Sequence, residues 1–168
     1  MKRDDDFAAY MRARWTTLVR SAILLGCSGA DAEDLAQVAL TRCYAVWPRV
    51  RDADNPDAYV YRVLVNAHRD SRRRRWWGER PTERVPDTAE TFDPFAELDV
   101  ADSVRRALAE LSAEHRAVVV LRFFAHLSEN DTAQALGVAV GTVKSRTSRA
   151  LAALATSAHL STSEWSVR

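Results

Sequence analysis

The chain has 168 residues, of which 47% are hydrophobic, so it can build the core of one domain or of two small ones. Its charges nearly cancel, with 24 Lys and Arg, 23 Asp and Glu and a formal net charge of +1, which argues against strong DNA binding through net charge alone. No apolar run approaches the roughly 20 residues that span a bilayer, and the N-terminal MKRDDDFAAY lacks the apolar stretch of a secretory signal. We therefore expect a cytoplasmic protein without a membrane segment.

The chain is predicted to begin with two amphipathic helices. Apolar residues recur at the helical period over residues 7–25, and Gly26 and Gly29 then break the helix. A second helix is expected to begin near Asp31 and to end at Pro48. Its inward stripe should consist of Ala32, Leu35, Ala39, Cys43 and Val46. Its polar side should consist of Glu33, Asp34, Gln37, Thr41 and Tyr44.

A third helix is predicted to start at Pro56, after a loop over residues 49–55, because proline favours the first turn of a helix. Its inward residues should be Tyr61, Leu64, Val65 and His68. Its outward stripe should be Arg62, Asn66, Arg69, Arg73 and Trp76. Such a stripe can be an ordinary solvated surface. Cations that hold phosphates and an indole that stacks on unpaired bases also suit a strand of DNA.

The sign of the charge reverses after residue 77. Residues 69–75 read RDSRRRR and are followed by Trp76 and Trp77, whereas residues 78–98 are mainly acidic and are interrupted by prolines. Since this acidic stretch has no sustained apolar period, we interpret it as a flexible linker between two small helical domains. With charges so balanced over the whole chain, the protein is expected to need a partner on DNA.

Residues 127–154 have the pattern of a helix-turn-helix, which is typical of DNA-binding proteins. Ala133 is small enough for two helices to approach, Gly137 suits a left-handed turn, and Val143 is placed to plug the second helix into the first. Ser128 and Asp131 predict a capping box at the start of the first helix. The second helix should turn inward Val140, Val143, Thr147, Ala150 or Leu151, and Leu154. It should turn outward Thr142, Lys144, Ser145, Arg146, Ser148 and Arg149. An ordinary helical hairpin with a solvated cationic face is the alternative interpretation.

No pattern in the sequence indicates catalysis or a bound metal. The chain has no Gly-rich phosphate loop and no arrangement of a nucleophile with a base. Its four histidines have no metal-ligand spacing with each other or with the cysteines. Cys27 and Cys43 are expected to be small core hydrophobes, with a redox pair as the alternative. We expect a protein that is not an enzyme and that uses no metal or cofactor.

Three segments stand in order along the chain: DAEDLAQ at 31–37, NPDAYVYRVLVNAHRDSRRRR at 55–75, and LSAEHRAVVVLRFF at 111–124 followed by SENDTAQALGVAVGTVKSR. Together they resemble the extracytoplasmic-function sigma factors, group IV of the sigma-70 family of bacterial RNA polymerase. By this resemblance, the first segment docks on the clamp of the polymerase largest subunit. The second recognises and opens the minus 10 element, and the third belongs to the domain that reads the minus 35 element.

The resemblance implies an all-α fold of two small helical domains joined by an acidic flexible linker. Residues 1–77 would form the region 2 domain, residues 78–98 the linker, residues 99–156 the region 4 domain with its helix-turn-helix, and residues 157–168 a tail. The implied partners are core RNA polymerase, through the largest-subunit clamp and the second-largest-subunit flap, and promoter DNA. An anti-sigma factor is a further candidate partner. The alternative function is a stand-alone helix-turn-helix regulator, which would leave the polar side of the second helix and the acidic linker unexplained.

The resemblance also assigns residues to each contact. The expected minus 35 contacts are Thr142, Lys144, Ser145, Arg146, Ser148 and Arg149. The expected minus 10 and melting contacts are Arg51, Asp52, Asn55, Arg62, Asn66, Arg69, Arg72, Arg73 and Trp76. The expected polymerase contacts are Glu33, Asp34, Gln37, Thr41 and Tyr44. The chain departs from the family at Val38, where an acidic residue is usual, at Thr132, where an aliphatic one is usual, and at Ala139, where a hydroxyl commonly caps the recognition helix.

Overall fold

The computed structural model describes residues 2–78 and 101–160. Every regular element within these two ranges is helical, which confirms the predicted all-α class. The acidic linker expected over residues 78–98 lies outside the described residues apart from Gly78, and so does the tail beyond residue 160.

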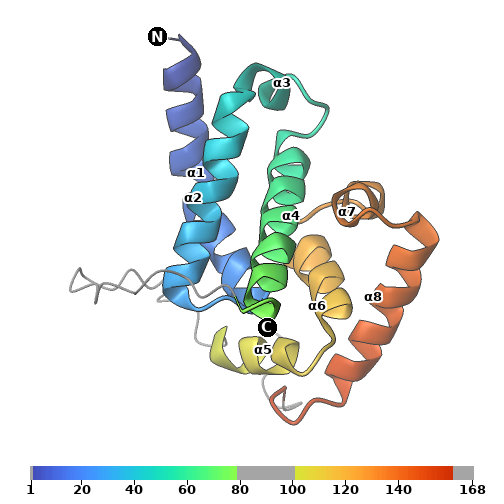
Figure 1. Cartoon of the computed structure of the whole chain (residues 1–168). Helices are drawn as coiled ribbons and strands as arrows, with labels where there is room; N and C mark the ends of the chain where they lie inside the picture. Colours follow the sequence, from blue (N-terminus) through green and yellow to red (C-terminus); the bar gives the residue numbers. More distant parts are fainter. Residues whose placement is uncertain (1, 79–100, 161–168) are drawn as a thin grey trace, which may run out of the picture.

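The first range contains four helices. They are α1 (Lys2–Leu24), α2 (Gly29–Ala45), the short α3 (Trp47–Arg51) and α4 (Pro56–Trp76). Helices α1 and α2 pack side by side, and α4 packs against α2 (Figure 1). Leu18, Ala39 and Leu64, one from each of the three long helices, are at most 1% exposed at the centre of this group.

Local sequence signals set the ends of these helices. Gly26 follows α1 with φ of 113°, which L side chains rarely adopt, and Ser28 caps α2 by accepting a hydrogen bond from the Asp31 N–H. Asn55 caps α4, whose first residue is the predicted Pro56. The four residues predicted to face inward from α4 are buried, except that His68 is only half-buried.

The structure corrects two details of the second helix. Helix α2 ends at Ala45, and Val46 is its non-helical C-cap with φ of −120°. Because the helical period stops there, Val46 does not continue the inward stripe and is 40% exposed. Pro48 lies in the first turn of α3, so the loop expected over residues 49–55 is shortened to residues 52–55.

The second range contains α5 (Ala101–Ala109), α6 (Ala113–Val119), a π-helical turn η1 (Val120–Phe124), α7 (Glu129–Leu136) and α8 (Val140–Ala155). Helices α7 and α8 form the predicted helix-turn-helix: Ser128 caps α7, Gly137 is left-handed with φ of 67°, and Val143 is fully buried. The sequence allowed either Ala150 or Leu151 as an inward residue of α8. In the structure Ala150 is buried and Leu151 is 44% exposed.

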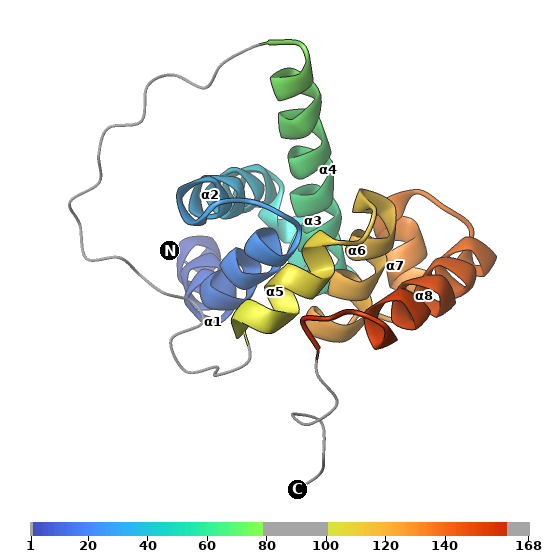
Figure 2. The ribbon, with the colours of Figure 1, turned by 90° about the horizontal axis from the view of Figure 1, so that it is seen from below.

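The two groups of helices pack against each other. Helix α4 lies between α2 on one side and α6 and α7 on the other, whereas α8 lies on the far side of α6 and α7 (Figures 1 and 2). Helix α1 also contacts α5 and η1. A single hydrophobic cluster joins residues of both groups, including Leu18 and Leu64 from the first and Leu121 and Leu136 from the second. The described helices therefore share one core.

Candidate nucleic-acid interface

Helix α8 presents most of its predicted outward residues to solvent. Lys144, Ser145, Ser148 and Arg149 are exposed, and Thr142 is partly exposed. Lys144 Nζ lies 3.7 Å from Glu129 Oε2 of α7. A helix that shows hydroxyls and cations on one face has the side chains that contact phosphates and base edges.

Arg146 is less free than the sequence predicts. Its side chain is only 20% exposed, because its guanidinium lies 3.4 Å from Glu114 Oε2 at the start of α6. Arg146 therefore lies on the predicted side of α8 but is less exposed than Lys144 and Arg149. The start of α8 also lacks a side-chain cap, since Ala139 stands at the N-cap position.

Helix α4 carries the second candidate surface. Arg62, Asn66, Arg69, Arg73 and Trp76 are all exposed, as the sequence predicts, and Arg72 is exposed beside them. The minus 10 contacts predicted from the sequence do not include Trp77. Its side chain is 76% exposed, beside Trp76, which is 87% exposed. Two solvated indoles at the end of a cationic stripe offer stacking surfaces for unpaired bases.

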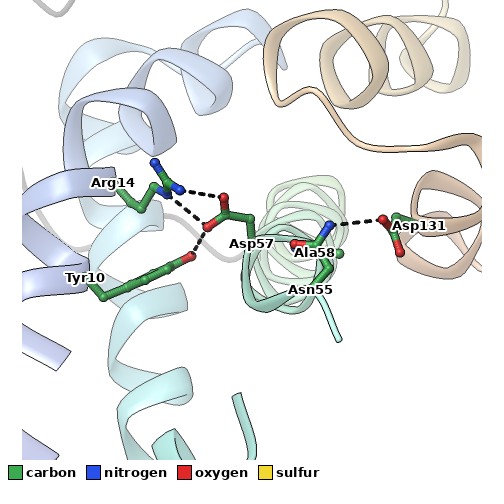
Figure 3. A network of polar contacts seen from close by, with 6 residues as sticks. All are labelled: Tyr10, Arg14, Asn55, Asp57, Ala58 and Asp131. Atoms are coloured by element: carbon green, nitrogen blue, oxygen red, sulfur yellow. Dashed lines mark hydrogen bonds and ion pairs between the residues drawn. The ribbon is translucent and has the colours of Figure 1, made fainter. Parts of the chain in front are cut away.

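The start of α4 is fixed from two sides, as Figure 3 shows. Asn55 Oδ1 accepts a hydrogen bond from the Ala58 N–H at 3.1 Å, while Asn55 Nδ2 donates to Asp131 Oδ2 of α7 at 3.0 Å. From the side of α1, Asp57 accepts a hydrogen bond from the Tyr10 hydroxyl at 2.7 Å and binds the Arg14 guanidinium through both carboxylate oxygens at 3.0 Å. Burial and the nearby Asp57 carboxylate raise the pKa of Tyr10, so its hydroxyl keeps the proton that it donates.

Most of this network has no signal in the sequence. Asn55 before Pro56 is a recognisable cap, but nothing in the pattern pairs Asp57 with α1 or Asn55 with α7. Arg51, the last residue of α3, is exposed and binds the exposed Asp52 at 2.8 Å, and it also lies 3.7 Å from Asp6. Asn55 therefore caps the start of α4, whereas Arg51 and Asp52 lie at the end of α3, before the loop that leads to it.

The predicted polymerase-binding side of α2 is open. Asp34, Gln37 and Thr41 are exposed and Glu33 is half-buried, with Val38 41% exposed among them. Tyr44 is different, because its hydroxyl donates to Asp4 at 2.6 Å and its ring lies under the Arg3 guanidinium. Tyr44 therefore also joins α2 to the first turn of α1.

Cys27 and His68 form a half-buried pair near the cationic end of α4. Cys27 Sγ lies 3.5 Å from His68 Nδ1. Burial, together with Arg72, Arg116 and Arg75, lowers the pKa of His68 to about 4. Burial raises the pKa of Cys27 to about 11 in spite of Arg75, so the thiol is protonated at neutral pH. Burial likewise raises the pKa of Cys43 to about 11. Cys43 is a core residue, as predicted, whereas Cys27 is partly buried and packs against the core.

Arg116 of α6 makes hydrogen bonds that no pattern in the sequence predicts. Its guanidinium donates to the carbonyl oxygens of Leu108, Ala109 and Leu111 at the end of α5, at 2.9 to 3.2 Å. It also donates to the Leu25 carbonyl after α1 at 3.1 Å. One side chain therefore caps α5 and joins the two groups of helices. Within the two described ranges, no helix has the length and apolarity needed to cross a membrane.

Comparison with known families matches both groups of helices. Residues 7–78 match the family described as Sigma-70 region 2, and residues 101–154 match the family described as Sigma-70, region 4. The first match contains α4 with its exposed stripe, and the second contains the helix-turn-helix.

Individual relatives agree with these matches. The chain is 39% identical to the RNA polymerase sigma-E factor of Streptomyces coelicolor over 153 residues, which cover 89% of this chain and 84% of the relative. It is 36% identical to the ECF RNA polymerase sigma factor SigM of Mycobacterium tuberculosis over 149 residues, covering 89% and 75% of the two chains. Among solved structures it is similar to the sigma factor RpoE of Bartonella quintana in complex with the anti-sigma factor NepR. That match has a TM-score of 0.70 and 29% identity and covers 89% of this chain and 94% of the other.

Proposed function

This chain belongs to the extracytoplasmic-function group of the sigma-70 family, and from that membership we propose that it directs RNA polymerase to promoters by reading a minus 35 element with α8 and a minus 10 element with α4. As a sigma factor it is a DNA-binding protein of transcription initiation and not an enzyme. It would contribute binding energy that selects a sequence and captures separated strands, while the polymerase performs the chemistry. The stand-alone regulator fails as an alternative, because it does not account for the region 2 match over residues 7–78.

The observation that carries this proposal is the exposed stripe of α4. Arg62, Asn66 and Arg73 are exposed on one face, and the stripe ends at the solvated indoles of Trp76 and Trp77. Cations bind the phosphates of a strand, and aromatic rings stack on bases that have left the duplex. The loop of residues 52–55 stands at the other end of the same helix, where it can receive an unpaired base of the non-template strand.

The remaining contacts follow from family membership and exposure. Lys144, Ser145, Ser148 and Arg149 would bind the minus 35 duplex directly, and Thr142 and Arg146 would contribute from the edge of α8. The polar side of α2, with Asp34, Gln37 and Thr41, would dock on the polymerase clamp, and the region 4 helices would dock on the flap. An anti-sigma factor is a further proposed partner, because the similar RpoE structure contains one.

Strand opening can be tested with Asn66→Ala. Asn66 is exposed in the stripe, so the substitution should leave assembly with core polymerase and closed-complex binding intact. It should reduce opening severalfold, because unstacking costs a few kcal/mol and needs compensating contacts to the freed strand. Opening is measured by the permanganate reactivity of unpaired thymines on a promoter identified with the wild-type protein.

Asn130→Ala is the matched control, since it removes another exposed amide, from α7. A promoter with a pre-melted minus 10 segment should restore most of the activity of Asn66→Ala. Equal loss of duplex binding and of opening, or no rescue by pre-melting, would mean that this face of α4 is only a general electrostatic contact.

A further inference from the structure

We infer that Tyr10 of α1 is a positioning residue for promoter opening, because it holds the loop of residues 52–55 in the shape that receives an unpaired base. The inference rests on the proposed function of this loop and adds a residue that acts on DNA only through the loop. The loop joins α3 to α4, and the Tyr10 side chain contacts both of these helices. One side chain of α1 therefore sets how the two flanking helices sit relative to each other.

Tyr10 binds the start of α4 through its hydroxyl. The hydroxyl donates to Asp57 Oδ1 at 2.7 Å, and Asp57 lies in the first turn of α4 (Figure 3). A carboxylate accepts a stronger hydrogen bond than a neutral group does, and it is favoured near the positive end of a helix dipole. Arg14, one turn further along the same face of α1, binds both oxygens of this carboxylate at 3.0 Å. The start of α4 is thus tied to α1 by adjacent polar contacts.

Tyr10 contacts α3 through its ring. The ring centroid lies 5.2 Å from that of Trp47, the first residue of α3, and Phe7 lies at the edge of the same indole at 5.2 Å. The last residue of α3, Arg51, lies 3.7 Å from Asp6 of α1. An exposed ion pair of this kind adds little stability, whereas Trp47 is only 3% exposed. The buried indole, and therefore Tyr10 beside it, provides most of the hold on α3.

The loop takes its shape from the two helices that flank it. The Asp52 N–H donates to the Pro48 carbonyl of α3 at 3.1 Å, and Asn55 Oδ1 accepts from the Ala58 N–H of α4 at 3.1 Å. A shift of α4 relative to α3 is therefore passed to the loop between them. A binding site loses much of its effect when its groups are displaced by about 1 Å, so a loop that is held in place captures a base better than a loose one.

Tyr10→Phe separates the two contacts, since it keeps the ring beside Trp47 and removes the hydrogen bond to Asp57. The matched control is Tyr61→Phe. The Tyr61 hydroxyl of α4 lies 3.1 Å from Ser21 Oγ of α1, so the control removes a tyrosine hydroxyl between the same two helices, about one turn further from the loop. Thermal unfolding checks that both variants are folded at the temperature of the assays.

The mobility of the loop is measured by hydrogen–deuterium exchange in the free full-length protein. Tyr10→Phe should speed the exchange of backbone amides over residues 52–59 severalfold, because the start of α4 loses an anchor. Tyr61→Phe should leave the exchange of this segment close to that of the wild type. Unchanged exchange over residues 52–59 in Tyr10→Phe, or an equal increase in Tyr61→Phe, would overturn the inference.

The effect on DNA is measured with the full-length protein and core polymerase, on a promoter identified with the wild type. Each position of the minus 10 element is changed to each of the other bases, and the rate of opening gives the base preference at that position. Ala53→Gly with Asp54→Gly loosens the loop itself and so identifies the position that the loop reads. Tyr10→Phe should reduce the preference at this same position severalfold and leave the other positions unchanged, whereas Tyr61→Phe should match the wild type.

Asp57 supplies a second pair of variants. Asp57→Asn keeps an acceptor for the Tyr10 hydroxyl and should retain most of the preference, whereas Asp57→Ala should lose it. Adding Tyr10→Phe to Asp57→Ala should cause little further loss, because both substitutions remove the same contact.

A normal base preference in Tyr10→Phe, or a loss spread evenly over all positions, would show that Tyr10 only stabilises the fold. A wild-type protein that gives no preference at any minus 10 position would refute the proposed function instead. A loosened loop that alters no position would refute base capture by the loop, and with it this inference, while leaving promoter recognition by the rest of α4 intact.

Discussion

His68 is a half-buried residue whose ionisation couples the stability of this protein to pH. Its ordinary pKa of 6.5 is lowered to about 4 by burial and by Arg72, Arg116 and Arg75, so the folded protein keeps the imidazole neutral. The unfolded chain binds the proton at higher pH than the folded one does. The contribution of His68 to the free energy of unfolding is therefore fully present above about pH 6.5 and is lost as the pH falls toward about 4.

His68→Asn should reduce this acid sensitivity. Between pH 7 and pH 5 the wild type should lose up to about 2 kcal/mol of unfolding free energy through His68, and the variant should lose correspondingly less. Urea titrations of both proteins at the two pH values measure the difference, and the other histidines cancel because both proteins contain them. Parallel pH dependence would show that His68 is solvated or charged in the folded state.

Arg149 and Arg146 should contribute unequally to DNA binding. Arg149 is exposed, whereas Arg146 is 20% exposed and already lies against Glu114. Arg149→Ala should therefore weaken minus 35 binding and lower the slope of log affinity against log salt by about one, and Arg146→Ala should change both less. Affinity measured over a range of salt concentrations decides this. Equal losses would mean that the Arg146 ion pair opens on DNA.

At the scale of elements, the helical period was sufficient to place most of the fold. It located α1, α2, α4, α7 and α8, and the cap at Ser128 followed from residue type. The short α3 was missed because Pro48 can either end a helix or occupy the first turn of one, and only the tertiary packing of Trp47 and Val50 selects the second. The π-helical turn η1 has no comparable sequence signal.

Helix α8 has a removable defect at its start. Ala139 has φ of −69° and ψ of 151°, close to the values of −65° and 165° at Ser128, which caps α7 with its hydroxyl. Ala139→Ser should therefore supply the missing cap and stabilise the protein by about 1 kcal/mol. Thermal unfolding should show a midpoint about 2 to 4 °C higher. An unchanged midpoint would indicate that water already satisfies the start of α8 equally well.

At the scale of the whole molecule, the sequence predicts the parts better than their assembly. The stripes on α4 and α8 are exposed largely as their spacing predicts, because amphipathic periodicity is a local property. The contact of Asn55 with Asp131 joins residues 76 positions apart, and the network of Tyr10, Arg14 and Asp57 joins α1 to α4. Pairings of this kind depend on how helices dock, which no local pattern encodes.

Transcription in vitro by core RNA polymerase, with and without this protein, tests the proposed function most directly. The 5′ ends of transcripts from fragmented genomic DNA of the source organism are mapped by sequencing. We expect the protein to create defined start sites whose upstream DNA shares two elements, near minus 35 and minus 10, and we expect Arg149→Ala and Asn66→Ala to reduce their use. Start sites that are unchanged by the protein, or that share no upstream element, would contradict promoter recognition by α8 and α4.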